Sequence, residues 1–445
     1  MGLTDRTPNP QRLRHTLGSY FTRTLTAAHR IRFHPAMHPN SKTRSFDHTA
    51  LPPAIRPSST SSNRCDLRHV SGASRLITLL VLTASLGTAT PAATPPQATP
   101  AATDPVVEPR ARNHLRVDYF IDESGREQPV RTQADWAKRR ADILVGFYAS
   151  TGELPDRSTL GPVRYTVVEG SRAEGPGFTR EKLMIDADDG DHIPAWLLRP
   201  TNASPGTRGP AVIALHQTHF RFGKDEIIGL AGSPNLAYAR ELAQRGFVVI
   251  APEFPTLGEY KYDFSKDRYP SGTLKGVWNH MRCVDLLSEL PDVDPQRIAA
   301  IGHSLGGHNA IWLSVVDTRI RAIVSSCGWT PTPYYKNGDL KGWEGERYLP
   351  RFLERYGNDP ARVPWDFPEL LAALAPRGFF SNSPIGDTNF AVEGVRLSVQ
   401  EASKIYALFG VPERLQVRYP DCGHDFPPEI REEAYRFIEA ELAKP

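Results

Sequence analysis

The chain has 445 residues, of which 40% are apolar and 23% are charged, a composition typical of a globular protein with one or two domains. Its net charge of +3 is uneven, because residues 1–75 carry twelve Lys and Arg against three Asp and Glu, which leaves the rest near −6. A main part without a basic excess argues against a nucleic-acid partner.

The N-terminal stretch, residues 1–75, is rich in Ser, Thr, Pro, His and Arg, which predicts a basic disordered arm. Arg75 then precedes an eleven-residue, mostly apolar run, Leu76 to Leu86, which is followed by small residues. The run is shorter than the ~20 residues that span a membrane. This pattern is typical of a secretory signal peptide, which we assign to residues 76–93; a buried helix is the alternative.

A signal peptide belongs at the start of a chain, so its position predicts that translation begins downstream of Met1. A start at Val70 would leave a short basic segment before the apolar run. We therefore expect an exported protein, periplasmic or secreted, without stable insertion in a membrane.

Two segments separate the signal peptide from the main domain. Residues 94–110 repeat Ala, Thr and Pro, which predicts an extended linker. Residues 111–180 are expected to form an N-terminal extension, in which Thr132 caps a helix from Gln133 to about Tyr148.

The main domain, residues 181–445, alternates strand-like and helical patterns. Asp189-Gly190 predicts a hairpin turn between strands at 182–186 and 192–198. Further strands are predicted at 210–215, 247–251, 297–301, 320–325, 377–382 and 415–419. Helices are predicted at about 235–245, 274–290, 392–409 and 429–442. The alternation predicts an α/β fold, with a mostly parallel central sheet and helices on both faces.

The most informative motif lies in the middle of this domain. Residues 302–306 read Gly-His-Ser-Leu-Gly, between an apolar strand and an apolar helix. A G-x-S-x-G sequence in that context is typical of a nucleophile elbow, a sharp turn that exposes the serine hydroxyl. We predict Ser304 as a nucleophile and the backbone N–H of Leu305, at the helix N-terminus, as an oxyanion donor.

A serine nucleophile needs a general base and an acid that orients it. His424 is the only histidine beyond the helix that follows the motif, and it stands in the loop after the strand at 415–419. Asp387 occupies the loop after the strand at 377–382. We predict that Ser304, Asp387 and His424 form a catalytic triad, with His424 as base and Asp387 as the acid that fixes its tautomer.

Other carboxylates compete with Asp387 for the role of the acid. Glu393 is expected in the first turn of the next helix, where a negative charge favours the helix dipole. The other rivals precede the strand or lie too close to His424 to orient its ring: Asp359, Asp366, Asp421 and Asp425.

Residues 180–443 resemble the α/β-hydrolase superfamily. The resemblance rests on the hairpin at Asp189-Gly190, the loop at His216, the elbow at Ser304 and the terminal Gly423-His424. The most similar branch is that of dienelactone hydrolases and acetyl xylan esterases, and the catalytic domain of prolyl oligopeptidases is similar too. In this fold the loop after the strand at 210–215 supplies the second oxyanion donor, here the backbone of Gln217 or Thr218.

The resemblance and the predicted triad imply an exported serine hydrolase that cleaves carboxylic esters through an acyl-enzyme. Export and the family likeness favour acetylated carbohydrate as the substrate. One alternative is a serine peptidase of the prolyl-oligopeptidase type, and another is a binding protein with a degenerate site. The oligomeric state is left open.

No cofactor and no metal site is predicted. The histidines nearest the site lack further ligands in register, so we expect hydrogen-bonded structural roles for His216, His219, His303 and His308. Of the four cysteines, Cys65 lies in the arm, and three cannot all pair. No C-x-x-C occurs, so neither a disulfide framework nor a zinc site is indicated.

An aromatic-rich insert, about residues 328–370, interrupts the alternation of strands and helices. Its aromatic residues could form a lid or substrate wall, or pack in the core. Glu259 and Tyr260, after another strand, could line the pocket or only pack in their loop.

Overall fold

The computed structural model describes residues 107–187, 190–202, 206–266 and 269–444. These residues all lie within one compact unit, Pro96–Pro445. The expected arm, the signal peptide and most of the linker lie outside the described residues, as does Asp189 of the predicted turn. Within the described part, no helix has the length and apolar character that crossing a membrane requires.

The core of the unit is a ten-stranded sheet in the order β12-β11-β10-β9-β7-β8-β6-β5-β3, with β4 paired to β5. The parallel strands are β7 (Gly209–Leu215), β8 (Val248–Pro252), β9 (Val293–His303), β10 (Ile320–Ser326), β11 (Gly378–Asn382) and β12 (Leu415–Arg418). The antiparallel strands are β3 (Tyr165–Val167), β4 (Ala173–Gly175), β5 (Phe178–Asp186) and β6 (His192–Pro200). The predicted hairpin is the β5–β6 pair. Each predicted strand is confirmed, and its first residue lies within two residues of the predicted start. The exceptions are β5 and β9, which begin four residues earlier than predicted.

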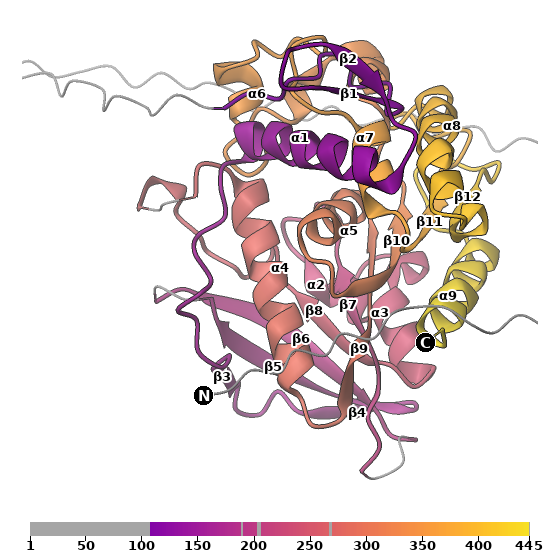
Figure 1. Ribbon diagram of the computed structural model, residues 1–445. Helices are drawn as coiled ribbons and strands as arrows, with labels where there is room; N and C mark the ends of the chain where they lie inside the picture. The colour runs from indigo at the N-terminus through magenta and orange to yellow at the C-terminus, as the bar shows by residue number, and fades with distance from the viewer. Residues whose placement is uncertain (1–106, 188–189, 203–205, 267–268, 445) are drawn as a thin grey trace, which may run out of the picture. The chain divides into compact units, whose positions relative to one another are not determined.

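Helices cover both faces of the sheet, as predicted (Figure 1). One face carries α4 (Gly272–Glu289), α5 (Leu305–Val316), α7 (Phe367–Leu374) and α8 (Val392–Leu408). The other carries α2 (Lys224–Ile227), α3 (Tyr238–Gln244) and α9 (Pro428–Leu442). Successive side chains of β7 point to opposite faces of the sheet. Ile213 packs in the core on the face of α4 and α5, whereas Val212 and Ala214 pack in the core on the face of α3 and α9.

The N-terminal segment contains β1 (Tyr119–Ile121), β2 (Glu127–Pro129) and α1 (Gln133–Thr151). Thr132 caps α1 in a reciprocal pair with Asp135, as its sequence position predicts. Buried side chains of α1, among them Trp136 and Phe147, belong to the same core as α5 and α7. The segment therefore shares the core of the main domain, and α1 runs three residues beyond its predicted end.

Two segments differ from expectation or resolve an open choice. The helix expected from residue 235 is a 3₁₀ turn, η1 (Pro234–Leu236), followed by α3, because the ψ angle of 34° at Ala237 interrupts the helical backbone.

The insert consists of 3₁₀ turns η3 (Thr332–Tyr334), η4 (Lys336–Gly338) and η5 (Leu340–Gly342) and the short helix α6 (Arg351–Glu354). Most of its aromatic side chains are buried in the core: Trp329, Tyr335, Trp343, Phe352, Tyr356, Trp365 and Phe367.

Candidate active site

Ser304 is the single residue between the end of β9 and the start of α5, and its backbone angles are φ 53° and ψ −117°. A backbone in this region is strained for a residue with a Cβ atom. The N–H of Ser304 donates to the carbonyl of Ser326 on the neighbouring strand β10, at 2.8 Å. The serine is therefore held in a sharp strand-to-helix turn, as the motif predicts.

The two glycines of the motif are required by close backbone contacts. A Cβ atom on Gly302 would lie 2.1 Å from the carbonyl oxygen of Gly306. A Cβ atom on Gly306 would lie 1.9 Å from the carbonyl oxygen of Leu215, at the end of β7. The second glycine thus lets the start of α5 approach the strand whose loop is expected to supply an oxyanion donor.

Asp387 and His424 meet at the carboxyl ends of β11 and β12. The Nδ1 atom of His424 lies 2.8 Å from Oδ2 of Asp387. The other carboxylate oxygen of Asp387 accepts the backbone N–H groups of Asn389, at 2.8 Å, and Phe390, at 3.2 Å. Burial opposes ionisation of this carboxyl, but the hydrogen bond and charge of His424 and the two amides outweigh it and lower the pKa of Asp387.

The loops that carry this pair are tied together by hydrogen bonds. The N–H of Gly386 donates to the carbonyl of Cys422, at 3.0 Å. The side-chain amide of Asn382, at the end of β11, donates to the carbonyl of Asp425, at 2.8 Å. The His424 ring also packs against the ring of Phe390. Because the ties flank both residues, the imidazole and the carboxylate are held in one orientation.

The rival carboxylates lie elsewhere. Glu393 is exposed in the first turn of α8. Asp366 caps α7, and burial raises its pKa to about 7. Asp359 accepts the N–H of Ala361 in a turn. The carboxylate of Asp425 accepts from Asn235. Asp421 is exposed. None of these five forms a hydrogen bond with His424 in the described part of the chain, which leaves Asp387 as its carboxylate partner.

The predicted oxyanion donors belong to the start of α5 and to the loop after β7. Leu305 opens α5, where backbone N–H groups have no acceptor within the helix. Thr218, with Ser304 and Leu305, lines the pocket at the serine. Gln217 is buried, and its side-chain amide donates to Glu226. Which backbone N–H of the Gln217–Thr218 pair would serve stays a prediction.

Sequence reasoning missed a buried ionic network behind this loop. His216 lies 3.0 Å from Glu253, whose other oxygen accepts from Lys224 at 2.9 Å. Burial opposes ionisation of Glu253, but its neighbours His216 and Lys224 outweigh it and lower the pKa to about 2. A glutamate directly after the apolar strand β8 was the available signal. Glu259 joins this network through Lys224, so its role is structural and it does not line the pocket.

The pocket at Ser304 has a volume of about 220 Å³. Its walls come from the loop after β7, the start of α5, the insert and the loop before α8: Thr218, Ser304, Leu305, His308, Tyr335, Gly342, Trp343, Tyr348, Asn389 and Phe390. Burial lowers the pKa of His308 to about 3, so its ring is neutral and no lining side chain carries a charge at neutral pH. The insert thus supplies both core and pocket wall, and the hydroxyl of its Tyr348 forms a hydrogen bond of 3.1 Å with that of Thr218.

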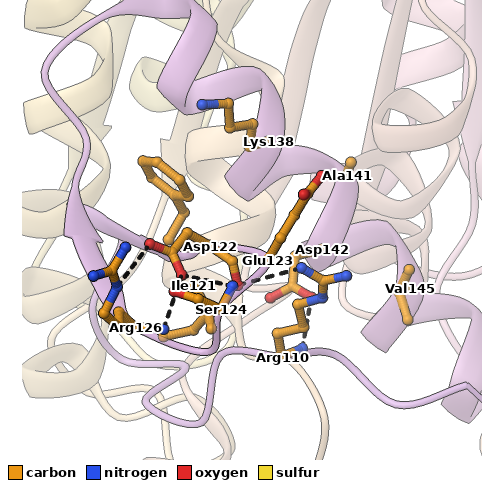
Figure 2. Close-up of a pocket in the computed structure, with 11 residues that line it drawn as sticks. Arg110, Ile121, Asp122, Glu123, Ser124, Arg126, Lys138, Ala141, Asp142 and Val145 are labelled. Carbon is orange, nitrogen blue, oxygen red and sulfur yellow. Dashed lines mark hydrogen bonds and ion pairs between the residues drawn. The ribbon is translucent and has the colours of Figure 1, made fainter.

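A larger cavity of about 660 Å³ lies away from the serine, between the β1–β2 hairpin and α1 (Figure 2). It is lined by charges of both signs, including Arg110, Asp122 and Lys138. Its serine, Ser124, donates to Asp122 at 2.6 Å, which makes it part of the hairpin turn. This cavity holds no histidine to activate a hydroxyl, so the pocket at Ser304 is the candidate site.

Known proteins resemble this chain in sequence and in fold. Residues 229–440 match the model of the Alpha/beta hydrolase family. YtaP of Bacillus subtilis, a hydrolase by name, is 25% identical over 315 residues, which cover 67% of this chain and 99% of YtaP. The carbohydrate esterase MZ0003, from an unknown prokaryotic organism, is 25% identical over 338 residues, 63% of this chain and 76% of that one.

Solved structures share the architecture. A glucuronoyl esterase from Solibacter usitatus superposes with a TM-score of 0.58 at 20% identity, covering 74% of this chain and 98% of the esterase. The α/β-hydrolase fold predicted from the sequence is confirmed, and the chain is a protein of that fold. The predicted class of enzyme, a hydrolase, is confirmed as well, and its finer form, a carboxylic ester hydrolase, agrees with the name of the relative MZ0003.

Proposed function

We propose that this chain is a serine esterase that cleaves carboxylic esters of carbohydrates, with Ser304, Asp387 and His424 as its catalytic triad. The observation that supports it most is the shared location of three groups. A strained serine lines a pocket after β9, and the ring of its chain neighbour His303 lies 4.9 Å from the ring of His424, which is hydrogen-bonded to the buried Asp387. These are the parts that acyl transfer requires.

The proposed reaction has two steps. The Ser304 hydroxyl attacks the ester carbonyl while its proton passes to Nε2 of His424, since Nδ1 is engaged by Asp387. The oxyanion accepts hydrogen bonds from the N–H of Leu305 and from the backbone of Gln217 or Thr218. Collapse expels the alcohol, which takes the proton from His424. Water, activated by the same imidazole, then hydrolyses the acyl-enzyme and restores the serine.

The pocket supports an uncharged, compact group next to the scissile bond. Its walls are aromatic on several sides, with Tyr335, Trp343 and Phe390, and they carry no charge. A peptidase that captures a free peptide terminus would need a charged group to pair with it. Aromatic faces and hydroxyls suit a neutral acyl or sugar group, and the pocket argues against a peptidase that binds a charged terminus.

We also propose that the protein is exported. It rests on the basic, apolar and small-residue pattern that ends near residue 93. N-terminal sequencing of the exported protein tests it. A mature N-terminus upstream of Leu76 would contradict both the signal peptide and the proposed start at Val70.

A substrate panel tests the catalytic function. We expect hydrolysis of aryl acetates and acetylated xylo-oligosaccharides, and no hydrolysis of proline-containing peptide amides. Cleavage of the amides at comparable kcat/KM would instead support the peptidase. A folded protein that cleaves neither would support a binding protein with a degenerate site.

A further inference from the structure

A third side chain with metal-binding chemistry lies against Asp387 and His424. Cys327 directly follows β10, the strand between the elbow strand β9 and β11. Within the described part of the chain, one ligand atom from each of Cys327, Asp387 and His424 lies within 4.8 Å of the others. A thiolate, a carboxylate and an imidazole are the ligands that Zn²⁺ prefers.

The spacing of the three groups is close to that of a bound ion. Metal–ligand distances of ~2.0–2.3 Å in a tetrahedron separate ligand atoms by roughly 3.3–3.8 Å. Nδ1 of His424 and Oδ2 of Asp387 are 2.8 Å apart, so they would separate slightly while the sulfur moved inward.

The backbone holds Cys327 in this position. Its φ angle is 48°, and its N–H donates to the carbonyl of Asn382 on β11, at 2.8 Å. Its thiol donates to the carbonyl of Asp425, at 3.2 Å, in the loop that carries His424. The same carbonyl also accepts from the Asn382 side chain, so it keeps a partner if the thiol binds a cation instead. The sulfur is therefore held beside the acid–base pair.

We propose that Cys327, Asp387 and His424 form an inhibitory binding site for a thiophilic divalent cation of the Zn²⁺ class. The cation binds the three side chains, with water completing a tetrahedron, and the thiol proton leaves to solvent. The side chain of His424 is 27% exposed, which gives the ion access from solvent. The binding of the cation is inferred from the geometry alone. Its inhibitory effect rests on the proposed function, because a cation bound to His424 would prevent the imidazole from acting as the base for Ser304.

Cobalt(II) absorption tests binding without any substrate. Co²⁺ titrated into the chelator-treated full-length protein is expected to give the near-ultraviolet band of a thiolate–cobalt bond. Cys327→Ala should abolish the band, with Cys327→Ser as a second variant should the alanine protein fail to fold. Cys422→Ala is the matched control, because Cys422 is a thiol on the loop of His424, and it should keep the band.

Zinc inhibition of ester hydrolysis is the second readout. Zn²⁺ should inhibit the wild type, with recovery on addition of EDTA. Cys327→Ala, normalised to its own activity, should require at least about tenfold more Zn²⁺ for half-inhibition, and Cys422→Ala should respond like wild type. A cobalt band or zinc sensitivity that survives Cys327→Ala, or that is lost in Cys422→Ala instead, overturns the site. A protein that cleaves no ester but still shows the Cys327-dependent band would refute the proposed function and leave the site standing.

Discussion

The Nδ1 atom of His424 lies 2.8 Å from Oδ2 of Asp387, although 37 residues separate them in the chain. The parallel order of β11 and β12 accounts for this, because parallel neighbours bring their carboxyl-end loops to the same edge of the sheet. The contact leaves Nε2 as the nitrogen that can take a proton from Ser304.

Replacing Asp387 should therefore damage catalysis more than folding. Asp387→Asn is expected to lower kcat by about 10³–10⁴-fold, since an amide can donate to Nδ1 and favours the wrong tautomer. Glu393→Gln, on the exposed first turn of α8, should leave kcat near that of wild type. Steady-state kinetics on an aryl acetate measures both. A larger loss in the Glu393 variant would reassign the acid.

The strained backbone of Ser304 predicts an unusual stability effect. Ser304→Gly should raise the free energy of unfolding by roughly 1 kcal/mol, because glycine relieves the strain at φ 53°. Ser304→Ala keeps the strain and should match wild type. Urea denaturation of the three proteins measures the difference. Equal stability of the glycine and alanine variants would mean that the elbow stores no strain.

Close packing at Gly306 gives a structural prediction. Gly306→Ala should cost roughly 3 kcal/mol of stability, since its Cβ atom would overlap the carbonyl of Leu215. Gly345→Ala is the matched control, because a Cβ atom there meets nothing within 4 Å, and it should change stability by less than about 0.5 kcal/mol. Thermal unfolding compares them. Equal melting temperatures would show that β7 and α5 can move apart freely.

The Glu253 carboxylate should link stability to acid pH. Its pKa is about 2 in the folded protein against roughly 4.3 when unfolded. Its contribution is therefore fully present above pH ~4.3 and is lost as the pH falls towards ~2. Glu253→Gln should lower stability at pH 7 by roughly 3 kcal/mol, and its deficit relative to wild type should shrink between those pH values.

Urea denaturation at pH 7, 5, 4 and 3 measures this dependence. Glu259→Gln is the control, because Glu259 also pairs with Lys224 but is 43% exposed and should cost less. A Glu253→Gln deficit that stays constant down to pH 3 would contradict the lowered pKa.

The indole of Trp343 should limit the size of the acyl group. It lines the pocket at Ser304 and packs on His308 with ring centres 4.8 Å apart. Trp343→Phe is expected to raise the kcat/KM ratio of butyrate to acetate esters by about tenfold. Trp329→Phe, a buried tryptophan outside the pocket, should leave the ratio unchanged. A ratio that rises equally in both variants would point to general loosening of the core.

The parts of the site that follow local patterns were predictable from the sequence. The elbow at Ser304 depends on a short motif between a strand and a helix, and the positions of Asp387 and His424 follow from the strands before them. The buried face of α9, with Ile430, Phe437 and Ile438, follows from helical spacing of apolar residues.

The remaining features depend on contacts between distant segments. The walls formed by Tyr335 and Trp343 come from irregular 3₁₀ turns, which have no apolar period to detect. The Glu253 network and the thiol of Cys327 join residues from separate loops. The sequence analysis predicted no zinc site because spacing motifs detect only ligands that lie close together in the chain. Cys327, Asp387 and His424 instead follow three different strands.

Labelling with a fluorophosphonate probe tests the central claim most directly, because the probe reacts with an activated serine without reporting on substrate choice. The wild type and Ser304→Ala would be labelled side by side and the adduct mapped by peptide mass spectrometry. We predict one adduct, on Ser304, that the substitution abolishes. No adduct on folded wild type, or an adduct that survives Ser304→Ala, would contradict the assignment of Ser304 as the nucleophile.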